Sequence, residues 1–95
     1  MHVNFFTMLT ITSVIPLEGY RLKLRFSDGT EGIADLSDIR RNGVFQAWND
    51  PDFFRSVSID PESQTVTWPT GIDLDPYVLY SRATGRAIDQ VLELV

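Results

Sequence analysis

The stretch "YRLKLRFSDGTEGIADL", residues 20–36, decides the fold of this chain. Apolar residues alternate with basic ones through its first half, which predicts a strand over residues 20–26 with one buried and one solvated face. The buried set is Tyr20, Leu22, Leu24 and Phe26, and the solvated set is Arg21, Lys23 and Arg25. An Asp-Gly turn comes next, and a further strand runs from Thr30 to Asp35 or Leu36. The stretch therefore predicts a β-hairpin.

The length of the hairpin loop follows from charge. A two-residue loop would set Glu31 opposite Phe26 on the buried face. A three-residue loop, with its glycine in the left-handed region, sets Glu31 opposite Arg25 instead. We therefore predict the three-residue loop, which also sets Asp35 opposite Arg21.

The basic row Arg21, Lys23 and Arg25 allows three interpretations: a nucleic-acid-binding edge, a partner surface, or the solvated face of a sheet. The three side chains would lie about 7 Å apart along the strand. In the predicted register, Glu31 and Asp35 neutralise most of the row and stabilise the sheet modestly. We therefore favour the solvated face over a nucleic-acid patch, and we keep the row as a candidate interaction surface.

The remaining elements are predicted from turn residues, caps and spacing. The strands are Met8–Pro16, which Pro16 ends, and a second hairpin of Val57–Asp60 and Thr65–Trp68 around the turn 61–64. A first helical turn is predicted over Asp38–Arg41, capped by Ser37 and closed by Asn42-Gly43, and a helical segment follows over Val44–Trp48. Another helix is predicted to start at Asp50-Pro51. The last covers Pro76–Thr84, with Asp75 as N-cap and Gly85 at its end.

The order of these elements indicates an α+β fold. We predict a small, mainly antiparallel sheet of about five strands in two hairpins, with short helices on one face and a C-terminal helix. Residues 1–95 are expected to form a single domain, because a chain of 95 residues has room for one modest core.

Composition excludes several chemistries. Without cysteine there is no disulfide, thiolate metal site or cysteine nucleophile, and the absence fits a cytoplasmic protein. No apolar run approaches the roughly 20 residues that span a bilayer. The net charge of −5 opposes binding to phosphate backbones. The one histidine, His2, lies at the terminus, where an oriented catalytic imidazole is not expected.

Pairs of carboxylates are the remaining candidates for metal or acid–base chemistry. Asp50 and Asp75 each precede a proline, so we interpret them as helix caps. Asp73 lies between Gly71 and the cap, and a metal or substrate role for it stays open. We predict no catalytic residue, no cofactor and no metal site, and we keep Asp73 and Asp75 as a candidate functional corner.

The segments "VIPLEGYRLKLRFSDGTEGIADLSDI", "GVFQAWNDPDFF" and "VTWPTGIDLDPYVLY" resemble the bacterial domain-of-unknown-function family 2442. The most specific part is the Trp-Pro-x-Gly-x-Asp-x-x-Pro motif, residues 68–76. The resemblance covers roughly residues 10–80 and implies a small α+β domain, alone or followed by a helix-turn-helix. It implies no activity and no catalytic residues. Many members lie beside a gene for another small protein, which suggests a toxin–antitoxin pair.

The last ten residues, Arg86–Val95, have an apolar stripe at helical spacing. The stripe consists of Ile88, Val91, Leu92 and Val95. A helix this short is marginal alone in water, so the stripe must dock on its own sheet, on a partner or on a second copy. We favour an intermolecular contact, most simply a twofold dimer.

These observations lead us to expect a non-enzymatic module that binds a protein partner, in the manner of an antitoxin. The alternative is a regulatory domain linked to DNA through dimerisation or a partner. A third hypothesis is a carboxylate-based enzyme that uses Asp73 and Asp75. We expect no direct contact with nucleic acid or with a membrane.

Overall fold

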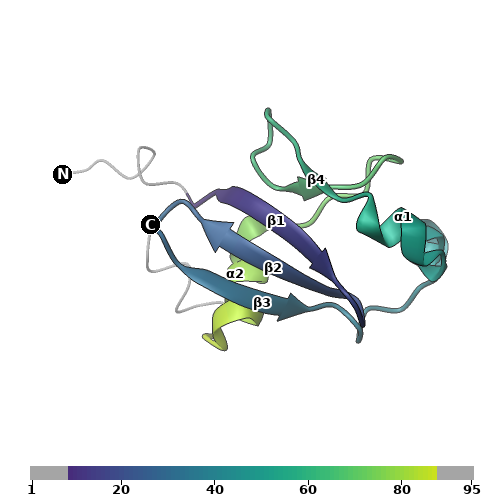
Figure 1. Ribbon diagram of the computed structural model, residues 1–95, viewed down its shortest axis with the longest axis horizontal. Coiled ribbons are helices and arrows are strands. Elements are labelled where there is room, and N and C mark those ends of the chain that lie inside the picture. Colours follow the sequence, from purple (N-terminus) through teal and green to yellow (C-terminus); the bar gives the residue numbers. More distant parts are fainter. Residues whose placement is uncertain (1–8, 88–95) are drawn as a thin grey trace.

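The structure is a computed structural model that describes residues 9–87. Three strands come first, then two short helices, a small hairpin and a last helix (Figure 1). The elements are β1 Ile11–Leu17, β2 Arg21–Phe26, β3 Glu31–Asp35, the 3-10 helix η2 Gly43–Asn49, α1 Pro51–Arg55, β4 Ser58–Ile59, β5 Val66–Thr67 and α2 Pro76–Thr84. The α+β class is confirmed. Within these residues, five strands form two antiparallel sheets, β1-β2-β3 and β4-β5, rather than one.

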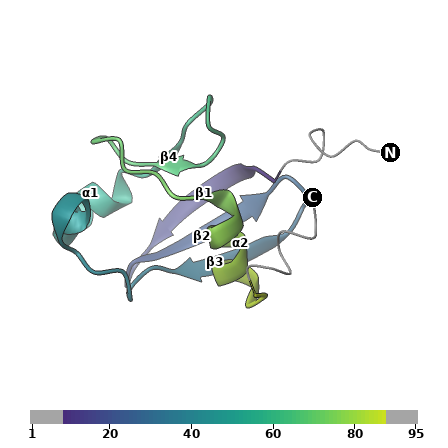
Figure 2. The ribbon, with the colours of Figure 1, turned by 180° about the vertical axis from the view of Figure 1, so that it is seen from behind.

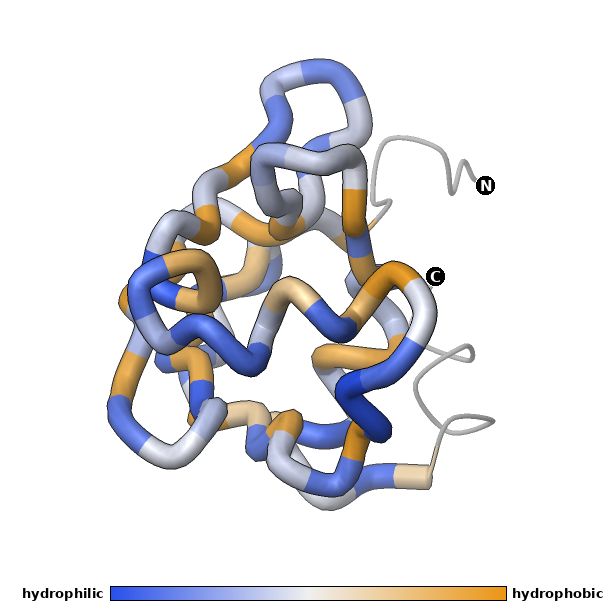
Figure 3. The backbone as a smooth tube through the Cα atoms, turned by 90° about the vertical axis from the view of Figure 1, so that its right-hand side faces the viewer, coloured by the Kyte–Doolittle hydropathy of each residue, from blue (hydrophilic) through white to orange (hydrophobic). Residues whose placement is uncertain are grey.

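The central hairpin has the predicted register. Arg25 lies opposite Glu31 and Arg21 lies opposite Asp35, which makes the loop three residues long. Gly29 has a φ of +89°, in the left-handed region that glycine adopts without strain. The buried residues of β2 alternate with exposed ones, as predicted. Figure 3 shows how hydrophobic and hydrophilic residues are interspersed along the backbone as a whole.

The ends of the first two strands differ from the prediction. β1 continues through Pro16 to Leu17. Pro16 is tolerated because β1 is an edge strand and the hydrogen-bonded positions alternate, so that the ring replaces an N–H directed away from β2. Tyr20 precedes β2 in a turn and has a positive φ of 58°, which is uncommon for a bulky residue.

The predicted helical turn capped by Ser37 is wrong. Residues 37 and 38 form a simple turn, and the carboxylate of Asp35 accepts the Ser37 N–H at 2.9 Å. Residues 39–42 are neither helix nor strand, and Arg41 stacks over the Tyr20 ring and donates to Asn49. Gly43 opens η2 instead of closing a preceding helix.

Both predicted Asp-Pro helix starts are confirmed. Asp50 accepts the N–H of Asp52 and begins α1, and Asp75 accepts the N–H of Tyr77 and begins α2. Gly85, with a φ of 78°, ends α2 as predicted. The second hairpin also forms, although β4 and β5 pair over only two residues each.

The core lies between the sheet and the elements that cover one face of it. Its buried residues are Leu9, Ile11, Leu22, Leu24, Phe26, Ala34, Leu36, Trp48, Phe54, Val66, Trp68, Ile72, Leu79 and Tyr80. Helix α2 lies across this face, as seen from behind in Figure 2. A Cβ on Gly32 would lie 2.6 Å from the Ala83 carbonyl oxygen, so this glycine permits the close approach of α2 to β3.

Candidate interaction surface

One face of the three-stranded sheet remains uncovered in the part of the chain that the structure describes (Figure 1). We call this surface the open face. It is formed by the residues of each strand whose side chains point away from α2. They are Ser13, Ile15 and Leu17 of β1, Arg21, Lys23 and Arg25 of β2, and Glu31, Ile33 and Asp35 of β3. The sequence-predicted basic row is therefore the middle strand of this face.

Charges of opposite sign face each other at both ends of the row. The side chain and N–H of Ser37 lower the pKa of Asp35 below its ordinary value, and the charge of Arg21 opposite it acts in the same direction. Arg21 also donates from Nε to the Glu18 carbonyl oxygen at 2.9 Å. At the other end, Glu31 lies opposite Arg25. The predicted neutralisation of the outer two cations is consistent with this register.

The middle of the open face is different in character. Lys23 lies between Ile15 and Ile33, which are 50% and 46% exposed. Among residues 9–87 no hydrogen bond or ion pair holds Lys23. A shallow hollow on the same face is lined by Ser13, Ile15, Lys23, Leu24, Arg25 and Glu31. An exposed apolar pair around a flexible cation is a feature of a contact surface more than of a phosphate-binding row.

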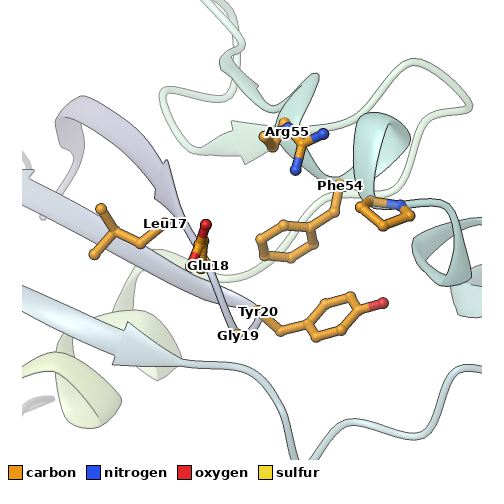
Figure 4. Close-up of a pocket in the computed structure, with 7 residues that line it drawn as sticks. Leu17, Glu18, Gly19, Tyr20, Phe54 and Arg55 are labelled. Atoms are coloured by element: carbon orange, nitrogen blue, oxygen red, sulfur yellow. The ribbon is translucent and has the colours of Figure 1, made fainter.

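A pocket of about 200 Å³ adjoins the open face at the end of β1 (Figure 4). It is lined by Leu17, Glu18, Gly19, Tyr20, Pro51, Phe54 and Arg55, and most of its lining is apolar. Leu17 belongs to both the pocket and the open face. The volume is below the roughly 300 Å³ of small-molecule sites, and it suits a single inserted side chain.

Tyr20 builds this pocket and was predicted only as a buried strand residue. Its hydroxyl donates to the Trp48 carbonyl oxygen at 2.7 Å, and its ring meets Phe54 edge-on at 5.0 Å. The guanidinium of Arg41 lies 4.5 Å from the ring centroid. These contacts hold the strained backbone of Tyr20 in place. The sequence signal was Gly19-Tyr20 between two strands, which marks a turn but not its partners.

The candidate corner at the start of α2 contains two aspartates in different surroundings. The Asp75 carboxylate caps the helix, accepting the Tyr77 N–H at 2.7 Å. Asp73 is exposed, and its backbone pairs with Thr67. Within residues 9–87 no three metal-ligating side chains lie together. His2 and the stripe Ile88, Val91, Leu92 and Val95 lie outside the described residues.

Comparison with known proteins gives the family. The profile of the family described as "Protein of unknown function (DUF2442)" matches residues 11–85, so the chain belongs to this family. A crystal structure from Nitrosomonas europaea, described as that of a "Putative DNA Binding Protein", is similar at a TM-score of 0.71 and 26% identity. The match covers 82% of this chain and 50% of that one, so this chain spans half the length of that protein.

No curated protein matches the chain. The helices that the structure describes are too short or too polar to cross a membrane.

Proposed function

We propose that this chain is a non-enzymatic interaction module that binds a protein partner through the open face. The observation that carries the proposal is the exposed pair Ile15 and Ile33 on either side of Lys23. A helix covers the opposite face of the same sheet, whereas nothing in residues 9–87 covers these side chains. Apolar groups grouped on a surface and rimmed by charge are typical of a protein contact.

The adjoining pocket supports the same proposal. Leu17 continues the open face into a mostly apolar hollow of about 200 Å³. Binding surfaces often concentrate their energy in one buried anchor, so a partner that covers the open face has a place for such a side chain. The resemblance to the family implies a neighbouring gene for another small protein, as in a toxin–antitoxin pair. The product of that gene is therefore the first partner to test. The absence of cysteine in this chain fits a cytoplasmic setting.

Co-expression with the neighbouring gene product and size-exclusion chromatography test this proposal. Replacing Ile15 and Ile33 together by Ser should weaken the complex at least tenfold and leave the melting temperature within a few degrees. The matched control is Val44→Ser, because Val44 is 70% exposed but lies on η2, away from the open face. A complex that tolerates the double variant and fails with Val44→Ser would move the binding surface to η2.

The second candidate is a regulatory domain linked to DNA, favoured by the similarity to the Nitrosomonas europaea protein. Two features oppose DNA binding: the net charge of −5, and the carboxylates that lie opposite Arg21 and Arg25. Electrophoretic mobility shifts at two salt concentrations distinguish the candidates. DNA binding that weakens steeply with salt, and is lost in Lys23→Ala, would replace the first proposal.

A further inference from the structure

The edge of β3 presents main-chain groups that no other strand within residues 9–87 uses. The β2–β3 ladder includes hydrogen bonds from Phe26 N to Thr30 O and from Leu36 N to Tyr20 O, both of 2.8 Å. Because hydrogen-bonded and non-hydrogen-bonded pairs alternate in an antiparallel ladder, residues 31, 33 and 35 are non-hydrogen-bonded to β2. Their N–H and C=O groups therefore point away from the sheet.

The two edges of the sheet are covered to different degrees. On β1, the Ile11 N–H donates to the Gln64 carbonyl oxygen at 3.0 Å, next to the β4–β5 hairpin. On β3, Arg82 donates from Nη1 to the Asp35 carbonyl oxygen at 2.9 Å and closes that end. Between residues 9 and 87, the main-chain groups of Glu31 and Ile33 have no such cover. A short unpaired edge therefore lies directly beside the open face.

The side chains along this edge define what it would attract. Glu31 and Asp35 are acidic, and the exposed Ile33 lies between them. The chain as a whole carries −5, which adds a long-range attraction for a basic partner. Edges protected against pairing usually place a charge, a proline or a bulge at their centre, whereas this one places an isoleucine there.

We propose that the β3 edge receives an extended segment of a partner protein as a fourth, antiparallel strand, with basic side chains two residues on either side of an apolar one. The inference rests on the proposed function and specifies the partner's chemistry. Directly opposed residues of paired strands share a face, so the two basic side chains would lie against Glu31 and Asp35 and the apolar one against Ile33. β2 already presents Arg25 and Arg21 to the same two acids on the other side.

A second copy of the chain fits this edge less well. β3 has no basic residue, so in any register a copy would set only carboxylate, apolar or small side chains against Glu31 and Asp35. In the symmetric register centred on Ile33, Glu31 would face Asp35 of the other copy, and like charges opposed across strands are destabilising. The geometry therefore favours a basic partner strand over self-pairing.

A peptide with the sequence of residues 20–26 in which Lys23 is replaced by Ile serves as the probe, because it has a basic residue two positions on either side of an apolar one. Titration into the isotope-labelled full chain, followed by NMR, should shift and protect the amides of Glu31 and Ile33 first. The same peptide with its two arginines replaced by Glu should show no binding. The variant with Glu31→Gln and Asp35→Asn should bind about fivefold more weakly.

Ile33→Pro tests the edge itself, because it removes an outward N–H and leaves the ladder to β2 intact. It should weaken peptide binding at least tenfold, with Glu62→Gln in the β4–β5 turn as the control without effect. The inference would be overturned if Ile33→Pro and the Gln/Asn variant bound the peptide as tightly as the unchanged chain does. It would also be overturned if the edge became protected with rising protein concentration in the absence of peptide, which indicates self-pairing. If the peptide fails while the Ile15/Ile33 double variant still abolishes the partner complex, the proposed function stands and the strand inference falls.

Discussion

The two faces of β2 share one backbone, but their side chains differ in exposure to solvent. Leu22, Leu24 and Phe26 are at most 1% exposed and belong to the core, whereas Arg21, Lys23 and Arg25 remain on the open face. Stability should therefore depend strongly on the first set and weakly on the second. Alternate residues of the same strand therefore separate the side chains that stabilise this small domain from those that we propose for partner binding.

The largest expected effect is that of Phe26→Asp. The ring of Phe26 meets Tyr80 of α2 edge-on at 4.8 Å, and an aspartate there would bury an unpaired charge. We expect a loss of more than about 4 kcal/mol and an unfolded chain by circular dichroism. Lys23→Ala, three residues earlier on the other face, should change stability by no more than about 0.5 kcal/mol. A folded Phe26→Asp with an unfolded Lys23→Ala would reverse the two faces.

Gly32→Ala should come next in size. Gly32 is on the α2 side of β3, and its new Cβ would lie 2.6 Å from the Ala83 carbonyl oxygen, so α2 must shift. We expect a loss of about 1–3 kcal/mol in urea unfolding. Ile33→Ala, the neighbouring residue on the open face, should cost less. Equal costs for the two variants would contradict the close approach of α2.

The start of α2 offers a smaller, sharper contrast between two aspartates. Asp75→Ala removes the acceptor of the Tyr77 N–H and should cost about 1 kcal/mol in thermal unfolding. Asp73→Ala removes an exposed carboxylate and should stay within about 0.5 kcal/mol. If Asp75→Ala left stability unchanged but abolished partner binding, the corner would be a functional site rather than a joint.

The smallest effect concerns pH and the hairpin turn. Burial alone would raise the pKa of Asp28, but hydrogen bonds from the Thr30 N–H and the Tyr80 hydroxyl outweigh it and lower the pKa below 3.8. The folded chain thus holds the proton less tightly than the unfolded chain. The stabilisation is present above about pH 3.8 and is lost as the pH falls through the lowered pKa. Asp28→Asn should flatten the acid side of the stability–pH curve, and an unchanged curve would contradict this role.

Much of the fold could be predicted from local signals. Alternation gave the two faces of β2, charge gave the register of Glu31 opposite Arg25, and aspartate before proline gave the starts of α1 and α2. Each of these signals depends on neighbouring residues and on backbone chemistry alone. The predictions that rest on residues 88–95, including a dimer through their apolar stripe, stay predictions.

The wrong and the missing predictions concern features that depend on contacts between residues far apart in the sequence. Ser37 does not begin a helix, and residues remote in the sequence contact this segment: Arg82 of α2 donates to Asp38, and Arg41 stacks on Tyr20. The pocket beside Leu17 was missed for the same reason. It requires the positive φ of Tyr20 and a hydrogen bond from the Tyr20 hydroxyl to Trp48, 28 positions away. The open edge of β3 follows only from the observed order of the strands.

Residue-resolved amide hydrogen exchange of the full chain, free and bound to its protein partner, tests the central claim that the partner binds the open face together with its β3 edge. In the free chain, the amides of Gly32 and Ala34 should exchange slowly, because they pair with β2, and those of Glu31 and Ile33 should exchange fast. Binding should slow Glu31 and Ile33 and leave the turn at residues 61–64 unchanged. Protection confined to α2 or to residues 61–64, with Glu31 and Ile33 still fast, would contradict the account.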